Sequence, residues 1–133
     1  MTLVRILKNW DFPDLKAQTP GCTGEWDGIQ FTCDPVEACD FLVVLQSVGP
    51  AVTVRCPAAN TLLILQEPPN EYFRAWHKGD PAFQSIITPD ETIRGARYRY
   101  GQPALPWHVQ RTYDQLKAAG PGAKDRPLSW ITS

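Results

Sequence analysis

Apolar runs of strand length alternate with polar segments along this chain. They predict short β-strands at residues 3–8, 29–32, 40–48, 52–56, 61–66 and within 83–90. The runs DFLVVLQSV (40–48) and TLLILQ (61–66) are continuously apolar instead of alternating, which is typical of strands that are covered on both faces.

Helical periodicity appears in two longer segments. The segment PNEYFRAWHKG (69–79) has Phe73, Trp76 and His77 on one face, and Gly79 suits its end. The clearest helix is in WHVQRTYDQLKAAGPG (107–122), where apolar side chains form one stripe and a Gly-Pro pair closes the helix. The residues of this stripe and of the closing pair are Val109, Tyr113, Leu116, Gly120 and Pro121.

Strands that alternate with helices predict an α/β domain, in the form of a Rossmann-like parallel sheet with flanking helices. In such sheets, ligands bind at the carboxyl ends of the strands. Glu67 lies at the end of the apolar run 61–66 and is followed by two prolines. A carboxylate held there by a stiff segment suits either chemistry or the stabilisation of the following helix, whose N-terminal dipole favours a negative charge.

The length and the net charge of the chain limit the classes of protein to which it can belong. The chain has 133 residues, which is enough for one domain, and its formal net charge is -1. This balance argues against a partner nucleic acid, because nucleic-acid binders usually carry a basic patch. The N-terminus has no signal-peptide pattern and no run is long enough for a transmembrane segment, so we expect a cytoplasmic protein.

The spacing of the cysteines and the absence of known binding motifs indicate whether the chain holds a metal or a cofactor. Cys22, Cys33, Cys39 and Cys56 include no close C-x-x-C pair, so free thiols are favoured over a zinc site or disulfides. The sequence has no phosphate-binding loop, no G-x-G-x-x-G opening a helix, no G-x-S-x-G and no H-E-x-x-H. We therefore expect neither a metal nor a cofactor site in this chain.

Seven short motifs follow one another along the chain: QTPGCTGEWDGIQFT, ACDFLVVLQ, LLILQEPPNEYF, ITPD, QPALPWHV, YDQL and LSWITS. In this order they resemble the N-terminal half of glycosyltransferase family 10, the α-1,3/1,4-fucosyltransferases. The resemblance implies the N-terminal half of a GT-B architecture, with an acceptor-side Rossmann-like domain in residues 1–125. Residues 126–133 then resemble the first strand of, or a linker to, an absent donor-binding domain.

The resemblance also implies a function. The whole enzyme would be an inverting fucosyltransferase-like glycosyltransferase that moves fucose from GDP-fucose to a glycan acceptor, and this truncated chain alone would be inactive. GDP-fucose would bind to the absent C-terminal domain. The alternatives are a stand-alone carbohydrate-binding or scaffold module without catalysis, and another nucleotide-sugar transferase of the GT-B type.

One catalytic residue is implied by the resemblance. Glu67 matches the position of the family's proposed base, which accepts the proton of the acceptor hydroxyl, and Glu71 is the alternative because two prolines follow Glu67. A base of this kind benefits from partial burial, which raises a carboxyl pKa.

Four further residues are candidates for acceptor binding. Trp107 and His108 suit a wall against a sugar ring, or else they begin the last helix with Trp107 in the core. Trp26 and Asp27 lie in GEWDG, which either borders the acceptor cleft or is only a turn.

Overall fold

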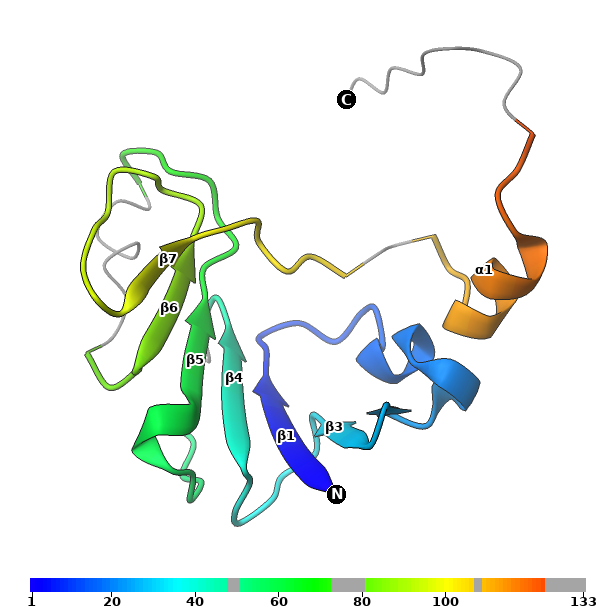
Figure 1. Ribbon diagram of the computed structural model, residues 1–133, viewed down its shortest axis with the longest axis horizontal. Helices are drawn as coiled ribbons and strands as arrows, with labels where there is room; N and C mark the ends of the chain where they lie inside the picture. Colours follow the sequence, from blue (N-terminus) through cyan, green and yellow to red (C-terminus); the bar gives the residue numbers. More distant parts are fainter. Residues whose placement is uncertain (48–50, 73–80, 107–108, 124–133) are drawn as a thin grey trace.

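The computed structural model describes residues 1–47, 51–72, 81–106 and 109–123. Seven strands form one sheet in the spatial order β2-β3-β1-β4-β5-β6-β7 (Figure 1). Their bounds are Thr2–Leu7 (β1), Glu25–Trp26 (β2), Ile29–Thr32 (β3), Phe41–Leu45 (β4), Thr61–Ile64 (β5), Ser85–Thr88 (β6) and Tyr98–Tyr100 (β7).

The sheet is parallel except for β2, which pairs antiparallel with β3. A two-residue turn joins these two strands, and its residues Asp27 and Gly28 have φ values of 51° and 76°. Positive φ at both positions is typical of the tight hairpin turns that match strand twist. After β3 the chain crosses to the other side of β1 and continues outward, so the order of strands reverses between β1 and β4. The prediction of a mostly parallel sheet is confirmed.

A cluster of buried apolar side chains lies on one face of the central strands. Leu7, Val44, Leu63 and Ile86 come from four neighbouring strands and are aligned in register, and Leu65 completes the buried cluster. Ile86 is fully buried. Alignment of branched apolar side chains across a parallel sheet gives a continuous apolar stripe, and its burial is the main favourable term in folding.

The continuous apolar runs are buried on both faces only toward their carboxyl ends. Leu45 and Ile64 point away from the core cluster, yet they are as buried as their neighbours Val44 and Leu63. At the start of β4, in contrast, Phe41 is 43% exposed. The sheet is therefore best covered near the edge at which parallel strands end.

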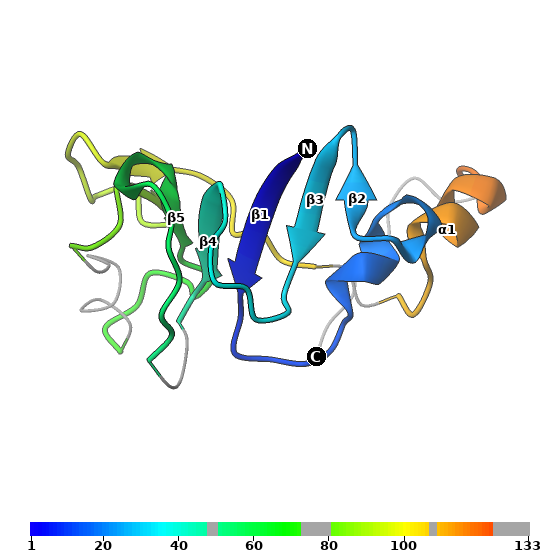
Figure 2. The same ribbon diagram turned by 90° about the horizontal axis from the view of Figure 1, so that it is seen from below.

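Helical structure in the described residues is limited. It comprises the 3-10 turns η1 (Leu15–Gln18), η2 (Pro20–Cys22) and η3 (Ala58–Asn60) and the α-helix α1 (Tyr113–Ala119). The helix lies beside β2 and η2, beyond the β2 edge of the sheet (Figure 2). Its Asp114 carboxylate accepts a 2.7 Å hydrogen bond from the Gly21 N–H, and the rings of Tyr113 and Trp26 meet edge to face at 4.6 Å.

This arrangement changes the predicted form of the α/β fold. No helical layer flanks the sheet in the parts of the chain that the structure describes. The helix predicted at 69–79 lies mostly outside those parts, as do residues 126–133. None of the described helices is long and apolar enough to cross a membrane.

Two local predictions need correction, and two strands were missed. Residues 52–56 form no strand; a single parallel bridge pairs Arg55 with Ala38. The last helix begins at Tyr113 rather than near 107, because the Thr112 side chain and Gln115 form a capping box there. Val109 therefore lies outside the helix and is 56% exposed. Strands β2 and β7 were not predicted.

Candidate functional site at the carboxyl edge

The candidate base Glu67 lies just beyond β5, and the end of β4 holds its backbone in place. The side-chain oxygen of Gln46 accepts hydrogen bonds from the backbone N–H groups of Gln66, at 2.7 Å, and of Glu67, at 3.1 Å. Gln46 itself has a φ of 63° and donates its own N–H to the Ile64 carbonyl at 2.8 Å. The carboxyl ends of β4 and β5 are therefore tied together at Glu67.

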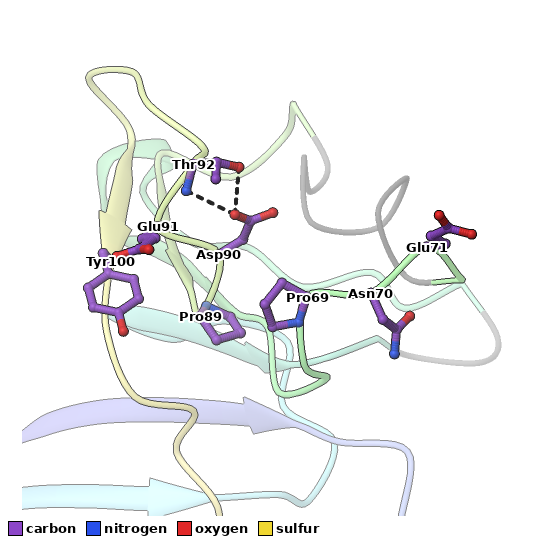
Figure 3. A pocket seen from close by; sticks show the side chains of 8 residues that line it. All are labelled: Pro69, Asn70, Glu71, Pro89, Asp90, Glu91, Thr92 and Tyr100. Atoms are coloured by element: carbon purple, nitrogen blue, oxygen red, sulfur yellow. Dashed lines mark hydrogen bonds between the residues drawn. The ribbon is translucent and has the colours of Figure 1, made fainter.

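A pocket of about 550 Å³ opens at the carboxyl ends of β5, β6 and β7 (Figure 3). We call it the acidic pocket, because three carboxylates contribute to its wall. It is lined by Pro69, Asn70, Glu71, Pro89, Asp90, Glu91, Thr92 and Tyr100. Three segments that are distant in sequence therefore build one cavity at the edge where ligands of parallel sheets bind.

The loop after β6 is the most constrained part of the acidic pocket. One carboxylate oxygen of Asp90 accepts hydrogen bonds from the Thr92 N–H at 2.9 Å and from the Thr92 hydroxyl at 2.6 Å. The Asp90 N–H donates to the Thr88 hydroxyl at 3.1 Å, and Thr88 is fully buried in β6. This loop is thus connected to the core and presents Asp90 and its neighbour Glu91 in a defined geometry.

The chemistry of the lining favours a ligand with many hydroxyl groups. Carboxylates accept hydrogen bonds from hydroxyls. Tyr100 is 61% exposed, and its aromatic ring offers a flat apolar surface to a ligand in the pocket. Figure 3 shows Tyr100 and Glu71 at opposite ends of the lining. Asp90, Pro69 and Pro89 lie between them. The three carboxylates among the described lining residues repel a phosphate, which disfavours a nucleotide against them. No cluster of three metal-ligating side chains occurs among the described residues.

A segment after β7 passes over the carboxyl ends of the strands (Figure 1). It is held at Gly101, whose N–H donates to the Thr88 carbonyl at 3.1 Å, and at Ala104, whose carbonyl accepts from the Gln66 side chain at 2.8 Å. Residues 101–106 therefore border the region around Glu67. The predicted acceptor-binding residues Trp107 and His108 follow this segment and lie outside the described residues.

The structure separates the other predicted site residues. Glu71 lines the acidic pocket, whereas Glu67 lies just before its first wall residue, Pro69. Trp26 and Asp27 belong to the hairpin at the opposite end of the sheet, where the Gly28 carbonyl accepts the Thr2 N–H at the start of β1. The turn interpretation of GEWDG describes its geometry, and the hairpin does not border the acidic pocket.

Sequence reasoning missed Tyr100, Asp90 and Glu91 as site residues. The Pro-Asp loop at the end of the strand in 83–90 was predicted, so the position of Asp90 at a carboxyl edge could have been predicted as well. The position of Tyr100 could not, because it depends on β7, whose sequence YRY is short and contains a charged residue.

The side chain of Trp26 lines a smaller cavity of about 240 Å³. It lies between η1 and the β1–β3 part of the sheet and is lined by Ile6, Leu15, Lys16, Thr19, Trp26, Phe31, Thr32 and Cys33. Trp26 therefore packs between this cavity and Tyr113 of α1.

Cys33 also lines this cavity. Burial raises the pKa of the Cys33 thiol, and the nearby positive charges of Lys8 and Arg5 only partly oppose this increase.

Comparison of the chain with protein-family models, with curated proteins and with solved structures finds no match. The features that bear on function are the acidic pocket, the position of Glu67 and the resemblance in sequence.

Proposed function

We propose that this chain is the acceptor-side domain of an inverting fucosyltransferase-like glycosyltransferase, which binds the glycan that receives the sugar. The observation that carries the proposal is the acidic pocket at the carboxyl ends of β5, β6 and β7, with Glu67 two residues before Pro69 of its wall. A Rossmann-like, GT-B assignment and a cytoplasmic location belong to the same proposal.

The glycan would enter through contacts that the lining offers to hydroxyl groups. One face of a pyranose ring packs against Tyr100, and its hydroxyls donate hydrogen bonds to carboxylates of the wall. The described lining residues carry three carboxylates and no positive charge, which favours a neutral sugar over a sugar phosphate as the ligand.

The reaction needs one carboxylate as a general base. The base accepts the proton of the acceptor hydroxyl while that oxygen attacks the anomeric carbon of the donor sugar, and it must lie within about 3 Å of the hydroxyl. Glu67 is the first candidate, because Gln46 holds its backbone and the Pro68-Pro69 pair stiffens the chain after it. Glu71 is the alternative, because it lies in the pocket itself.

The donor belongs elsewhere in this proposal. A GDP-sugar carries two phosphates, and the acidic pocket would repel them. A second domain that supplies positive charge would hold GDP-fucose above the carboxyl edge, so the isolated chain should bind an acceptor and transfer nothing.

Saturation-transfer NMR tests the proposal with N-acetyllactosamine-type oligosaccharides and, in a separate sample, with GDP-fucose. We expect saturation of the oligosaccharide only, lost in Glu71→Gln and retained in the control Glu37→Gln, an exposed glutamate before β4. Loss in Trp26→Ala instead would move the acceptor site to the hairpin. Binding of GDP-fucose, or of neither ligand, would contradict the proposal.

Catalysis separates the transferase from the alternative of a binding module. Both require the glycan to bind, but only the transferase requires a base. In a protein that joins this chain to its donor-binding half, Glu67→Gln should abolish transfer while leaving glycan binding intact. Unchanged transfer would assign the base to Glu71 or remove the catalytic role of this chain.

A further inference from the structure

Two of the four cysteines lie side by side at the amino-terminal end of the sheet. Ala38 and Arg55 form a parallel bridge, in which the Arg55 N–H donates to the Glu37 carbonyl and the Cys39 N–H donates to the Arg55 carbonyl, both at 2.9 Å. The next residues in register are Cys39 and Cys56. Side chains at paired positions point to the same face, so the two thiols share one side of the bridge.

The spacing of this pair matches the requirements of a disulfide. Neighbouring strands lie about 4.8 Å apart, and disulfides join residues whose Cα atoms are about 4.4–6.8 Å apart. Burial and, after it, the neighbouring Cys39 thiol raise the pKa of the Cys56 thiol, so the two side chains influence each other, and both thiols are reduced in this structure. The two side chains therefore start from adjacent positions on one side of the bridge, within the usual span of a disulfide.

The surroundings of Cys56 hold its sulfur at this place. The Cys56 Sγ lies 3.5 Å from the Pro57 carbonyl oxygen, 3.7 Å from that of Asn60 and 3.8 Å from that of Asp40. The Asn60 side chain also donates to the Asp40 carbonyl at 2.9 Å. Cys39 is buried, whereas Cys56 is only partly buried and is reached first by a reagent from solvent.

We propose that Cys39 and Cys56 are a redox-active pair, which a small disulfide oxidant such as oxidised glutathione converts into an intramolecular disulfide. The Cys56 thiolate attacks one sulfur of the oxidant, forms a mixed disulfide and releases one glutathione thiolate. The Cys39 thiolate then attacks the Cys56 sulfur and releases the second. Two protein thiols are oxidised, one glutathione disulfide is reduced to two thiols, and the two protons pass to the leaving thiolates.

This crosslink would act at the end of the sheet opposite to the acidic pocket. It joins the start of β4 to the chain that enters η3 and β5. Asp40, next to Cys39, is itself bound to β1, because its N–H donates to the Leu3 carbonyl at 3.0 Å and its carboxylate accepts the Leu3 N–H at 2.7 Å. Oxidation would therefore fasten three strands together without touching the pocket, and the proposal does not depend on the proposed function.

Peptide mapping after oxidation tests the pair directly. The reduced chain is incubated with oxidised glutathione at mildly alkaline pH, unreacted thiols are blocked, and the product is digested with trypsin and a glutamate-specific protease. Cuts after Glu37 and Arg55 place Cys39 and Cys56 on separate peptides that contain no other cysteine. We expect these two peptides to be joined, and the intact chain to lose the mass of two hydrogen atoms.

Variants provide the controls. Cys22→Ser combined with Cys33→Ser should form the same crosslink, and Cys56→Ser should form none. The proposal is overturned if Cys39 and Cys56 are still recovered as blocked thiols when Cys22 has become glutathionylated. It is also overturned if the joined peptides contain Cys22 or Cys33, or if only dimers of the chain form.

Discussion

The side chain of Gln46 holds the backbone of Glu67: its oxygen accepts the N–H of Glu67 at 3.1 Å as well as the N–H of Gln66 at 2.7 Å. The direction in which the chain leaves β5 is thus set by a residue of the loop after β4. The position of the candidate base depends on a contact between residues 21 apart in sequence.

Replacement of Gln46 by alanine should lower the free energy of unfolding by about 1–3 kcal/mol, because two backbone donors lose their partner. The φ of 63° at Gln46 lies in the left-handed region, which costs a non-glycine residue about 1–2 kcal/mol. Gln46→Gly should therefore be less harmful than Gln46→Ala. Urea denaturation measures both, and equal stabilities of the two variants would contradict the assigned strain.

Removal of a buried charge should stabilise the chain. Arg5 on β1 is 6% exposed, and its Nε and Nη1 atoms have no hydrogen-bond partner in the part of the chain that the structure describes. Unpaired buried polar groups cost about 1–3 kcal/mol. Arg5→Met should raise the free energy of unfolding by this order in urea titrations. The control is Arg55→Met, because Arg55 is exposed and its 3.8 Å pair with Glu37 is weak. A loss of stability in Arg5→Met would show that the guanidinium has a partner.

Truncation of Tyr100 should weaken glycan binding by about tenfold, the equivalent of ~1.4 kcal/mol, because an aromatic surface in the pocket is lost. Tyr72→Ala is the matched control: Tyr72 is 89% exposed and does not line the acidic pocket. NMR titration of each variant with the same oligosaccharide measures the ratio. Equal affinities would place the sugar elsewhere.

The start of α1 depends on Thr112, whose hydroxyl accepts the Gln115 N–H at 3.2 Å while the Gln115 side chain accepts the Thr112 N–H at 2.9 Å. Thr112→Ala should cost about 1 kcal/mol, whereas Thr112→Ser keeps the cap. Hydrogen exchange should show faster exchange in α1 and unchanged exchange in β1. Faster exchange in both elements would mean that α1 and the sheet open together.

Alkylation should distinguish two of the cysteines. Burial raises the pKa of the Cys33 thiol, so less of it is thiolate at a given pH, and iodoacetamide should modify exposed Cys22 before Cys33. A thiol with a raised pKa in the folded state stabilises the fold fully below its unfolded pKa. That contribution is lost as the pH rises through the folded pKa. Wild type should thus lose more stability at alkaline pH than Cys33→Ser, and equal losses would contradict the shift.

The strands were predictable where burial dictates their composition. Residues 40–48 and 61–66 must be apolar on both faces near their carboxyl ends, and this requirement produces continuous runs such as LLIL, which are typical of buried parallel strands. Residues 52–56 begin with the β-branched run Val-Thr-Val but pair only at Arg55, because composition does not determine whether a neighbouring strand is available.

The missed elements carried signals of a different kind. The Asp27-Gly28 turn between EW and IQFT is a hairpin signature, and Thr112 three residues before Gln115 is a capping signature. Both are local. The acidic pocket has no local signature, because Glu71, Asp90 and Tyr100 come together only through the order of β5, β6 and β7. Sequence reasoning reached Glu71 through resemblance and had no physical route to the pocket as a whole.

The small strand β2 has a consequence for self-association. Without it, β3 would present an outer row of unpaired backbone groups on which another chain can add as a strand. Glu25 and Trp26 occupy that row in an antiparallel direction. Trp26 contacts Tyr113 of α1, so this helix also covers the side chain of Trp26 at this end of the sheet. Two residues and one turn thereby close an edge that would otherwise favour aggregation.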